Sequence, residues 1–256
     1  MLKLYSKLSL KEEYNMSGHS KWANIRRKKE ATDSKKANIF SKIGKELTVA
    51  VKMGGSGDPN VNSKLKDVIA KAKANNMPND NINRCIQKAI GDSNSANYEE
   101  IVYEGFGPCQ TAIIVEVMTD NKNRAAADIR SIFSKSGGSL GQTGSVGYMF
   151  DKKGYILIEQ TGDIDEDELM LNVLDNGAED FVSEEGYIEI TCAPENFSKL
   201  REYIESINLQ PVEADIRQIA NMKKELSEDE EVKFQNFLDK LEDNDDVQNV
   251  WHNADI

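Results

Sequence analysis

Residues that support redox and metal chemistry are scarce in this chain of 256 residues, which contains three cysteines and two histidines. Cys85, Cys109 and Cys192 are odd in number and lie far apart, so the sequence predicts no disulfide framework and favours a reducing cytoplasm. His19 and His252 lie in no Cys/His spacing that binds zinc. We therefore expect no metal ion and no other cofactor.

Catalytic motifs are also missing. The chain has no HExxH and no nucleophile elbow, and its glycine-rich stretches at residues 53–60 and 136–148 match no phosphate-binding loop. We interpret both stretches as flexible connections, although the second could also be a mobile finger that inserts into a partner. The sequence predicts a protein that is not an enzyme and has no small-molecule substrate.

Two acidic clusters, at residues 163–168 and 225–231, have carboxylates that could hold a metal ion. Carboxylates in the first turn of a helix are also stabilised by the helix dipole. Ser227 is a residue type that caps helix N-termini. We therefore interpret both clusters as the starts of helices.

Long apolar runs are absent, and no stretch approaches the roughly 20 residues that cross a bilayer. We therefore expect no membrane partner. Residues 1–15 lack arginine, and Glu12 and Glu13 interrupt their amphipathic face, which disfavours an organelle-targeting segment. We interpret residues 1–15 as a disordered extension ahead of a functional start at Met16.

Acidic residues are scarce at the start of the chain and abundant afterwards. Residues 1–90 hold 19 Lys and Arg against 8 Asp and Glu, whereas residues 91–256 hold 13 against 36. The first part therefore carries a charge of +11 and the second −23, which together give the net charge of −12. A basic module of this kind predicts a polyanionic partner, and nucleic acid is the first to consider.

The basic residues are densest in residues 17–47. Lysine and arginine neutralise phosphates, and an exposed aromatic ring can stack on an unpaired base. Alternatively, the lysines form an ordinary solvated face, and Trp22 anchors the core of a helical bundle. The predicted nucleic-acid-binding residues are Lys21, Trp22, Arg26, Arg27, Lys28, Lys29, Lys35, Lys36, Lys42 and Lys45.

Arginine is much rarer than lysine, at 7 residues against 25. Reading a base sequence in the major groove favours the planar, bidentate guanidinium group, whereas lysine contacts the backbone. We therefore expect the protein to bind folded RNA or a ribonucleoprotein rather than a DNA operator. An AT-rich genome would also favour lysine over arginine, so the ratio indicates a preference and does not exclude DNA.

The first third of the chain carries a helical pattern. Phe40, Ile43, Leu47 and Val51 recur at steps of three and four residues, so they share one face of a helix. Most lysines of this stretch lie off that face. Residues 16–94 are predicted to form a small basic helical domain.

Beyond Tyr98, segments rich in β-branched and aromatic residues alternate with helical patterns. Residues 151–219 follow the order strand, helix, strand, strand, helix, strand, which is ferredoxin-like. Residues 95–150 contain three strands, the last at 144–150, and one helix. A helix and a strand within residues 220–256 would complete this unit. The predicted fold is α+β with three domains, in which the second domain is interrupted by the third.

Six dissimilar motifs follow one another along the chain. They are MSGHSKWANIRRKK (16–29), NMPNDNI (76–82), YEGFGP (103–108), TDNKNRAAADIR (119–130), GGSLGQTGSVGYMF (137–150) and LEDNDDVQNVWHNADI (241–256). With them, residues 16–256 resemble the YebC/PmpR family. The resemblance implies a helical domain followed by two α/β domains, and a cytoplasmic location. Cys109 and Gln110 depart from the family pattern, which often has two glycines there, so the form of this turn is in doubt.

The resemblance implies two functional roles. Some family members are described as DNA-binding transcriptional regulators. Others resemble ribosome-associated factors that relieve stalling on proline-rich nascent chains, and a mitochondrial relative activates translation of a cytochrome oxidase subunit. We favour a ribosome- or RNA-binding translation factor, with ribosomal RNA as the partner. The alternatives are DNA-binding transcription regulation and a protein-interaction module whose basic face is merely solvated.

Overall fold

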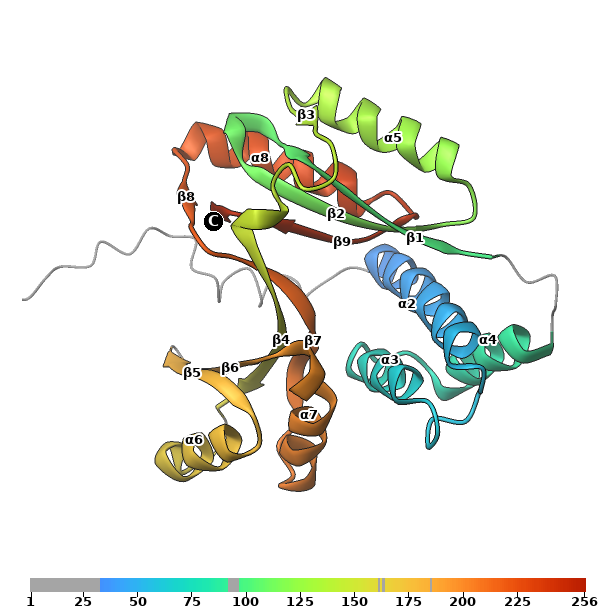
Figure 1. Cartoon of the computed structure of the whole chain (residues 1–256), viewed down its shortest axis with the longest axis vertical. Helices are drawn as coiled ribbons and strands as arrows, with labels where there is room; N and C mark the ends of the chain where they lie inside the picture. Colours follow the sequence, from blue (N-terminus) through green and yellow to red (C-terminus); the bar gives the residue numbers. More distant parts are fainter. Residues whose placement is uncertain (1–32, 92–96, 161, 163, 185) are drawn as a thin grey trace, which may run out of the picture.

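The computed structural model describes residues 33–91, 97–160, 162, 164–184 and 186–256 (Figure 1). Within these residues it has seven α-helices and three β-sheets, which confirms the α+β class. No helix in this part of the chain is both long and apolar enough to cross a bilayer.

A helical bundle forms the N-terminal part of the described chain. It consists of α2 (Asp33–Gly54), α3 (Ser63–Ala74) and α4 (Asn79–Gly91), with α2 packed against both other helices. The predicted apolar face of α2 is confirmed, because Ile43 is 2% exposed and Leu47 is fully buried. The 3.6-residue period of this face therefore determines which side of α2 meets α3 and α4.

Asn62 ties together the connection between α2 and α3. Its side chain accepts a hydrogen bond from the backbone N–H of Leu65 at 3.0 Å, which caps α3. The same side chain donates to the carbonyl groups of Ala50 and Ser56, each at 2.9 Å. The glycine-rich stretch 53–60 is therefore anchored to both helices rather than being a free connection.

The first sheet has the strand order β3-β1-β2-β9, and all its neighbouring strands are antiparallel. Helices α5 and α8 lie over one face of it (Figure 1). Between them the rings of Phe133 and Phe237 meet edge to face, with centroids 5.0 Å apart, inside an apolar core. The elements are β1 (Glu99–Phe106), 3-10 helix η1 (Pro108–Gln110), β2 (Ala112–Thr119), α5 (Lys122–Lys135), β3 (Ser139–Leu140), 3-10 helix η2 (Gly147–Met149), α8 (Glu228–Glu242) and β9 (Val247–His252).

The third strand of this region was predicted wrongly. The sequence places it at residues 144–150, but that segment contains η2, and Phe150 is the first residue of the next sheet's strand. Ser139 and Leu140 pair with β1 instead. The apolar residues near position 146 resemble a strand in sequence, yet the backbone amides here turn toward a side chain of β1.

That side chain is Glu104, which is 8% exposed. Its carboxylate accepts hydrogen bonds from the backbone N–H groups of Gly144, Val146 and Gly147, at 2.8, 3.0 and 2.7 Å. Burial alone would raise the pKa of Glu104, but the three amides outweigh it, and the pKa is lowered. The buried carboxylate therefore fixes the course of the loop.

Two glycines allow this loop to approach β1 closely. A Cβ atom on Gly105 would lie 2.4 Å from the carbonyl oxygen of Ser139, and one on Gly138 would lie 2.6 Å from that of Phe106. Neither position has room for a side chain. The loop at 136–148 is held against β1, contrary to the expected flexible connection.

The second sheet has the strand order β5-β6-β4-β7, again antiparallel throughout. Side chains of two helices share an apolar core with the strands. The elements are β4 (Phe150–Glu159), α6 (Glu166–Asp175), β5 (Ala178–Glu184), β6 (Tyr187–Cys192), 3-10 helix η3 (Pro194–Asn196), α7 (Phe197–Ser206) and β7 (Pro211–Ala220).

The order of elements from β4 to β7 is the predicted strand, helix, strand, strand, helix, strand. The ferredoxin-like assignment and the division into three domains remain predictions. After β7, a short parallel pair forms between β8 (Lys224–Glu225) and β10 (Ala254–Asp255). The chain between them returns to the first sheet, because β9 pairs with β2.

Both acidic clusters begin helices, as predicted. The Asp165 side chain accepts a hydrogen bond from the backbone N–H of Glu168 at 3.0 Å, which caps α6. Ser227 precedes α8, and its backbone N–H donates to the Glu230 carboxylate at 3.0 Å in a capping box. These carboxylates stabilise the positive ends of helix dipoles.

The turn that departs from the family pattern is left-handed at two successive residues. Cys109 has φ = 60° and Gln110 has φ = 57°. Outside glycine this conformation costs about 1–2 kcal/mol per residue, because Cβ approaches the carbonyl oxygen. The η1 turn therefore stores backbone strain at positions where glycine would have none.

Replacing Gln110 by glycine is expected to stabilise the protein. Removing the strain stabilises the folded state by more than the flexible glycine stabilises the unfolded state. The free energy of unfolding should therefore rise by about 0.5–1 kcal/mol. Urea unfolding of the Gln110→Gly variant measures it. Gln142→Gly is the control, because Gln142 is exposed but has no positive φ, and it should lower stability. If both variants are less stable than wild type, the backbone at Gln110 is not strained.

Glu104→Gln is expected to destabilise the protein by about 2 kcal/mol at neutral pH, since a charged acceptor of three amides is lost. The folded-state pKa lies below the ordinary value of 4.5. The carboxylate therefore contributes stability above pH 4.5, and this contribution disappears as the pH falls through the folded-state pKa. Urea unfolding at several pH values should show the two proteins converging in acid.

Glu100→Gln on the same strand provides the control. Glu100 is exposed and lies 3.3 Å from Lys64 in a surface ion pair, which is worth at most about 1 kcal/mol. Equal losses for the two variants, or a difference that does not change with pH, would show that the Glu104 carboxylate does not hold the loop.

Candidate nucleic-acid interface

The predicted nucleic-acid-binding residues fall into two groups. Six lie outside the described part of the chain, and for a seventh, Lys35 at the start of α2, the side chain is not described, so the assignment of all seven stays a prediction. Of the other three, Lys36 is exposed on the first turns of α2, while Lys42 and Lys45 are half-buried. The seven are Lys21, Trp22, Arg26, Arg27, Lys28, Lys29 and Lys35.

Lys42 and Lys45 face the protein's own C-terminal segment. The ammonium group of Lys42 donates to the carbonyl oxygen of Glu242 at 2.7 Å. That of Lys45 donates to the carbonyl oxygen of Asp245 at 2.8 Å and lies 2.9 Å from the carboxylate of Asp246. In this structure, neither ammonium group is free for a phosphate, and their assignment to a nucleic-acid surface stays a prediction.

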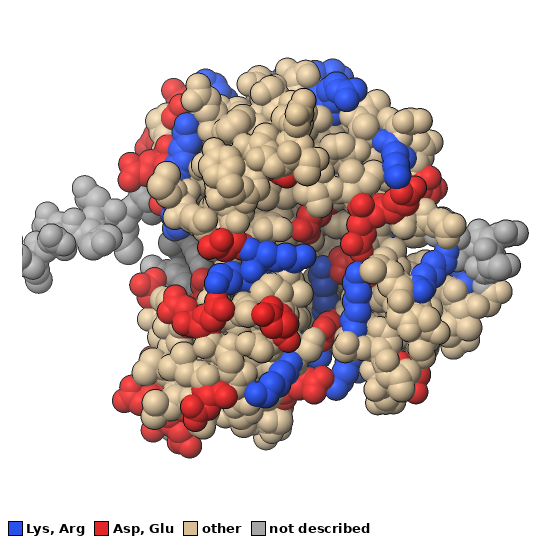
Figure 2. Space-filling view, in the orientation of Figure 1, with Lys and Arg blue, Asp and Glu red and all other residues tan. Residues whose placement is uncertain are grey.

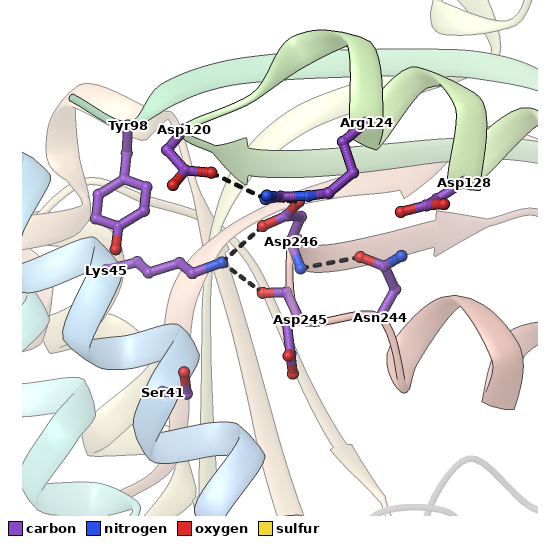
Figure 3. Close-up of a pocket in the computed structure, with 9 residues that line it drawn as sticks. All are labelled: Ser41, Lys45, Tyr98, Asp120, Arg124, Asp128, Asn244, Asp245 and Asp246. Atoms are coloured by element: carbon purple, nitrogen blue, oxygen red, sulfur yellow. Dashed lines mark hydrogen bonds and ion pairs between the residues drawn. The ribbon is translucent and has the colours of Figure 1, made fainter. Parts of the chain in front are cut away.

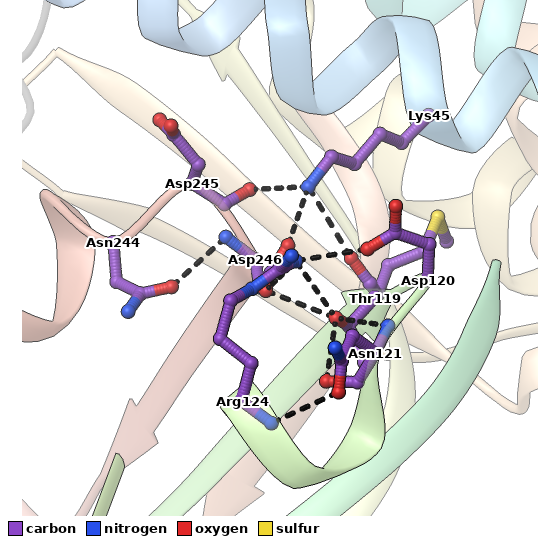
Figure 4. A network of polar contacts seen from close by, with 9 residues as sticks. Lys45, Thr119, Asp120, Asn121, Arg124, Asn244, Asp245 and Asp246 are labelled. Atoms are coloured by element: carbon purple, nitrogen blue, oxygen red, sulfur yellow. Dashed lines mark hydrogen bonds and ion pairs between the residues drawn. The ribbon is translucent and has the colours of Figure 1, made fainter. Parts of the chain in front are cut away.

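Asp246 is the centre of this junction (Figure 4). Its side chain is 9% exposed, and one carboxylate oxygen pairs with Lys45. The other accepts from Arg124 at 2.8 Å and from the Thr119 hydroxyl at 2.9 Å. Burial would raise the pKa of Asp246, but these donors outweigh it and hold the pKa below its ordinary value. The carboxylate is therefore fully engaged in joining α2, β2 and α5.

Local turns bring the members of the junction together. Thr119 ends β2, and Asn121 caps α5 by accepting from the backbone N–H of Arg124 at 3.1 Å. Asn244 accepts from the backbone N–H of Asp246 at 2.9 Å. Most of these residues belong to the motifs at 119–130 and 241–256, so the motifs meet in space through capping and turn contacts.

A polar pocket of about 390 Å³ opens beside the junction (Figure 3). Two cations and four carboxylates line it, so its charge does not favour a phosphate. No group of three or more His, Cys, Asp or Glu in the described residues is arranged to hold a metal ion. The lining residues are Ser41, Lys45, Tyr98, Asp120, Arg124, Asp128, Asn244, Asp245 and Asp246.

A second junction joins α3 to α7. Arg201 is 2% exposed, and its guanidinium donates to the carboxylate of Asp67 at 2.9 Å. Ser198 donates to the other oxygen of that carboxylate at 2.6 Å. At the surface, Lys66 and Glu202 form an ion pair at 2.7 Å. The helical bundle is thus held to both α/β parts by polar contacts.

Lys71, also on α3, forms its ion pair inside the protein. Its ammonium group lies 2.8 Å from the carboxylate of Glu46. Burial would lower the pKa of Lys71, but Glu46, together with Asp215 and Glu116, outweighs it and raises the pKa. The group therefore stays charged and serves packing rather than binding.

Three exposed cations of the bundle are different. Lys73, Arg84 and Lys88 have no carboxylate at ion-pair distance among the residues the structure describes. Sequence reasoning did not select them, because they lie outside the dense segment 17–47. The sequence feature that points to them is the scarcity of acidic residues across the whole first third of the chain.

Charge is unevenly spread over the surface. On the face in Figure 2, acidic side chains gather over the part of the molecule that contains α6, at the lower left. Blue and red side chains interleave where the bundle meets the α/β parts. The basic charge of the bundle is therefore divided between internal junctions and exposed positions.

Comparison with known proteins identifies the family. The chain matches the TACO1/YebC protein N-terminal domain over residues 20–92 and the TACO1/YebC second and third domain over residues 98–254. A "Probable transcriptional regulatory protein" of Acetivibrio thermocellus is 56% identical over 239 residues, which cover 93% of this chain and 98% of that protein. One of the same name from Clostridium beijerinckii is 53% identical over 241 residues, with coverages of 94% and 98%.

A solved structure is also similar. The crystal structure of the conserved hypothetical protein Aq1575 from Aquifex aeolicus has a TM-score of 0.77 and 35% sequence identity, covering 88% of this chain and 92% of that one. The resemblance seen in the sequence motifs is confirmed over nearly the whole chain. The chain belongs to the TACO1/YebC family.

Proposed function

We propose that this protein is a nucleic-acid-associated regulator of gene expression that acts in translation by docking on RNA of the ribosome. The names of its relatives support regulation of gene expression. The choice of RNA and of the ribosome rests on the chemistry of the basic module. Its effect would be the relief of stalling on proline-rich nascent chains, as the family resemblance implies.

The observation that carries the proposal is the charge of the helical bundle. Between residues 36 and 91 the described side chains include ten Lys and Arg but only four Asp and Glu. Lys73, Arg84 and Lys88 are exposed without a carboxylate partner in that part of the structure. Cations of this kind bind a phosphate backbone and release its condensed counterions.

The residue types favour RNA over an operator sequence. Arg84 is the one arginine among the ten cations of residues 36–91. Lysine binds phosphate as a point charge and reads no base sequence. The bundle is therefore suited to a folded RNA backbone, where recognition depends on shape.

The mechanism requires no covalent chemistry. The bundle docks on the RNA backbone, and its buried junctions with α7 and with Asp246 set the position of the α/β parts. A factor of this kind acts by stabilising one conformation of its partner more than another. The acidic body is repelled by RNA, so the bundle is the side that approaches it.

A second candidate is a DNA-binding transcriptional regulator, which the names of the relatives favour. It would use the same cations but would need base contacts, and so would prefer one promoter sequence over random duplex. The third possibility, a protein-interaction module, would not need the exposed cations at all.

The Lys73→Glu, Arg84→Glu, Lys88→Glu variant is expected to bind purified ribosomes and a fluorescein-labelled RNA hairpin at least about tenfold more weakly. If all three side chains contact phosphates, the slope of log K against log[salt] should become shallower by about 2–3. Fluorescence anisotropy and ribosome co-sedimentation at several salt concentrations measure both quantities. Random and promoter duplex DNA are titrated in parallel.

The matched control is Lys135→Glu, Lys199→Glu, Lys240→Glu, which changes the net charge equally at exposed positions of the α/β parts. It should retain most of the affinity. If both variants lose affinity equally, the change in net charge alone would explain the effect. Strong preference for a promoter would favour the transcriptional alternative, and unchanged binding by both variants would favour the protein-interaction module.

A further inference from the structure

The acidic segment at residues 242–246 lies against the lysine-bearing face of α2. Four of its five residues are Asp or Glu. Asn38 and Lys42 both donate to the carbonyl oxygen of Glu242, at 3.4 and 2.7 Å, and Lys45 contacts the end of the segment. Residues 38, 42 and 45 are spaced by four and three, so one face of the helix meets the segment.

The two lysines are held with different strength. Lys45 has a buried carboxylate partner in Asp246. Lys42 has a carbonyl oxygen as its acceptor and no carboxylate at ion-pair distance among the described residues. The carbonyl oxygen therefore offsets only part of the hydration that the half-buried ammonium group has lost. A phosphate oxygen, which is charged, would be a stronger partner.

The pKa of Lys42 agrees with this description. Burial lowers it, and the opposing charges of Glu242, Asp245 and Asp243 do not fully restore it. The side chains of these three acids are exposed and act on Lys42 through space. They surround the ammonium group with negative charge without bonding to it directly.

The same three carboxylates stand where a polyanion would approach. Lys42 and Lys45 lie one turn apart on the same face of α2, about 4.5 Å along its axis at 1.5 Å per residue. A phosphate backbone that reaches Lys42 must come within a Debye length of the acids, about 8–10 Å at physiological salt, where repulsion is not screened. The acids and the polyanion therefore compete for one face of α2.

We propose that the acidic segment 242–246 is an autoinhibitory contact, which covers Lys42 and is displaced from it when the basic bundle binds nucleic acid. This inference rests on the proposed function. The turn at residues 243–245 moves away from α2, and Lys42 exchanges the Glu242 carbonyl oxygen, at the end of α8, for a phosphate oxygen. Asp246 stays in place, because its carboxylate is bonded to Arg124 and Thr119 as well as to Lys45.

The test removes the charges but keeps the backbone acceptors. The Glu242→Gln, Asp243→Asn, Asp245→Asn variant should bind a fluorescein-labelled RNA hairpin about fivefold more tightly than wild type at low salt, with the gain shrinking as salt rises. The control is Asp167→Asn, Glu168→Gln, Asp175→Asn on α6, where three exposed acids give the same change in net charge. It should bind close to wild type.

Amide hydrogen exchange gives a second readout on wild-type protein. With saturating RNA hairpin, peptides covering residues 242–245 should exchange faster, whereas the amides of β9 should be unchanged. Slower or unchanged exchange in the segment would overturn the proposal, because RNA would then leave it in place or cover it.

The outcomes separate this inference from the proposed function. If wild type binds RNA and the two triple variants bind equally tightly, the autoinhibitory contact is refuted while the proposed function stands. Binding by the 242–245 variant alone would support complete autoinhibition. Absence of RNA binding in wild type and both variants would refute the two proposals together.

Discussion

The buried carboxylate of Asp246 is the contact on which the relation between the bundle and the first sheet depends. It brings together Lys45 of α2, Thr119 at the end of β2 and Arg124 of α5. Removing a carboxylate from water is costly, and three donors offset this cost only when all are present. The loss of one donor would leave a partly unpaired buried charge, so this junction favours a single arrangement over a range of loosely docked ones.

Opposite charges on the two parts of the chain do not by themselves explain this docking. Exposed pairs such as Lys64 with Glu100 and Lys66 with Glu202 contribute at most about 1 kcal/mol each and are screened by salt. The buried groups set the geometry, since a charge such as that of Arg201 tolerates few alternative partners. Lys73, Arg84 and Lys88 take no part in either kind of pair among the described residues.

The sequence predicted what depends on local pattern. The period of the apolar residues in α2 identified its buried face, and β-branched and aromatic residues indicated strands beyond Tyr98, where β1 and β2 lie. The prediction was wrong where a distant group determines the local structure. Residues 144–150 have the pattern of a strand, but Glu104 accepts hydrogen bonds from their backbone amides and holds them in a loop. The partners of Lys42 and Lys45 lie about 200 positions away, and the composition of residues 17–47 carries no information about them. The lysines were recognised as basic, yet their internal use was not visible.

The carboxylates of this protein have two opposite roles that depend on burial. Glu104 and Asp246 are buried, accept hydrogen bonds from several donors and have lowered pKa values, so they act as fixed anions that shape loops. Both organise motif segments, which gives those segments a structural role that requires no catalysis. Exposed acids such as Asp243 and Asp245 make no comparable contacts and act over a distance. Under the proposed function, a polyanion is therefore repelled from the α/β parts and attracted to the bundle, and its approach is opposed most strongly where these acids border α2.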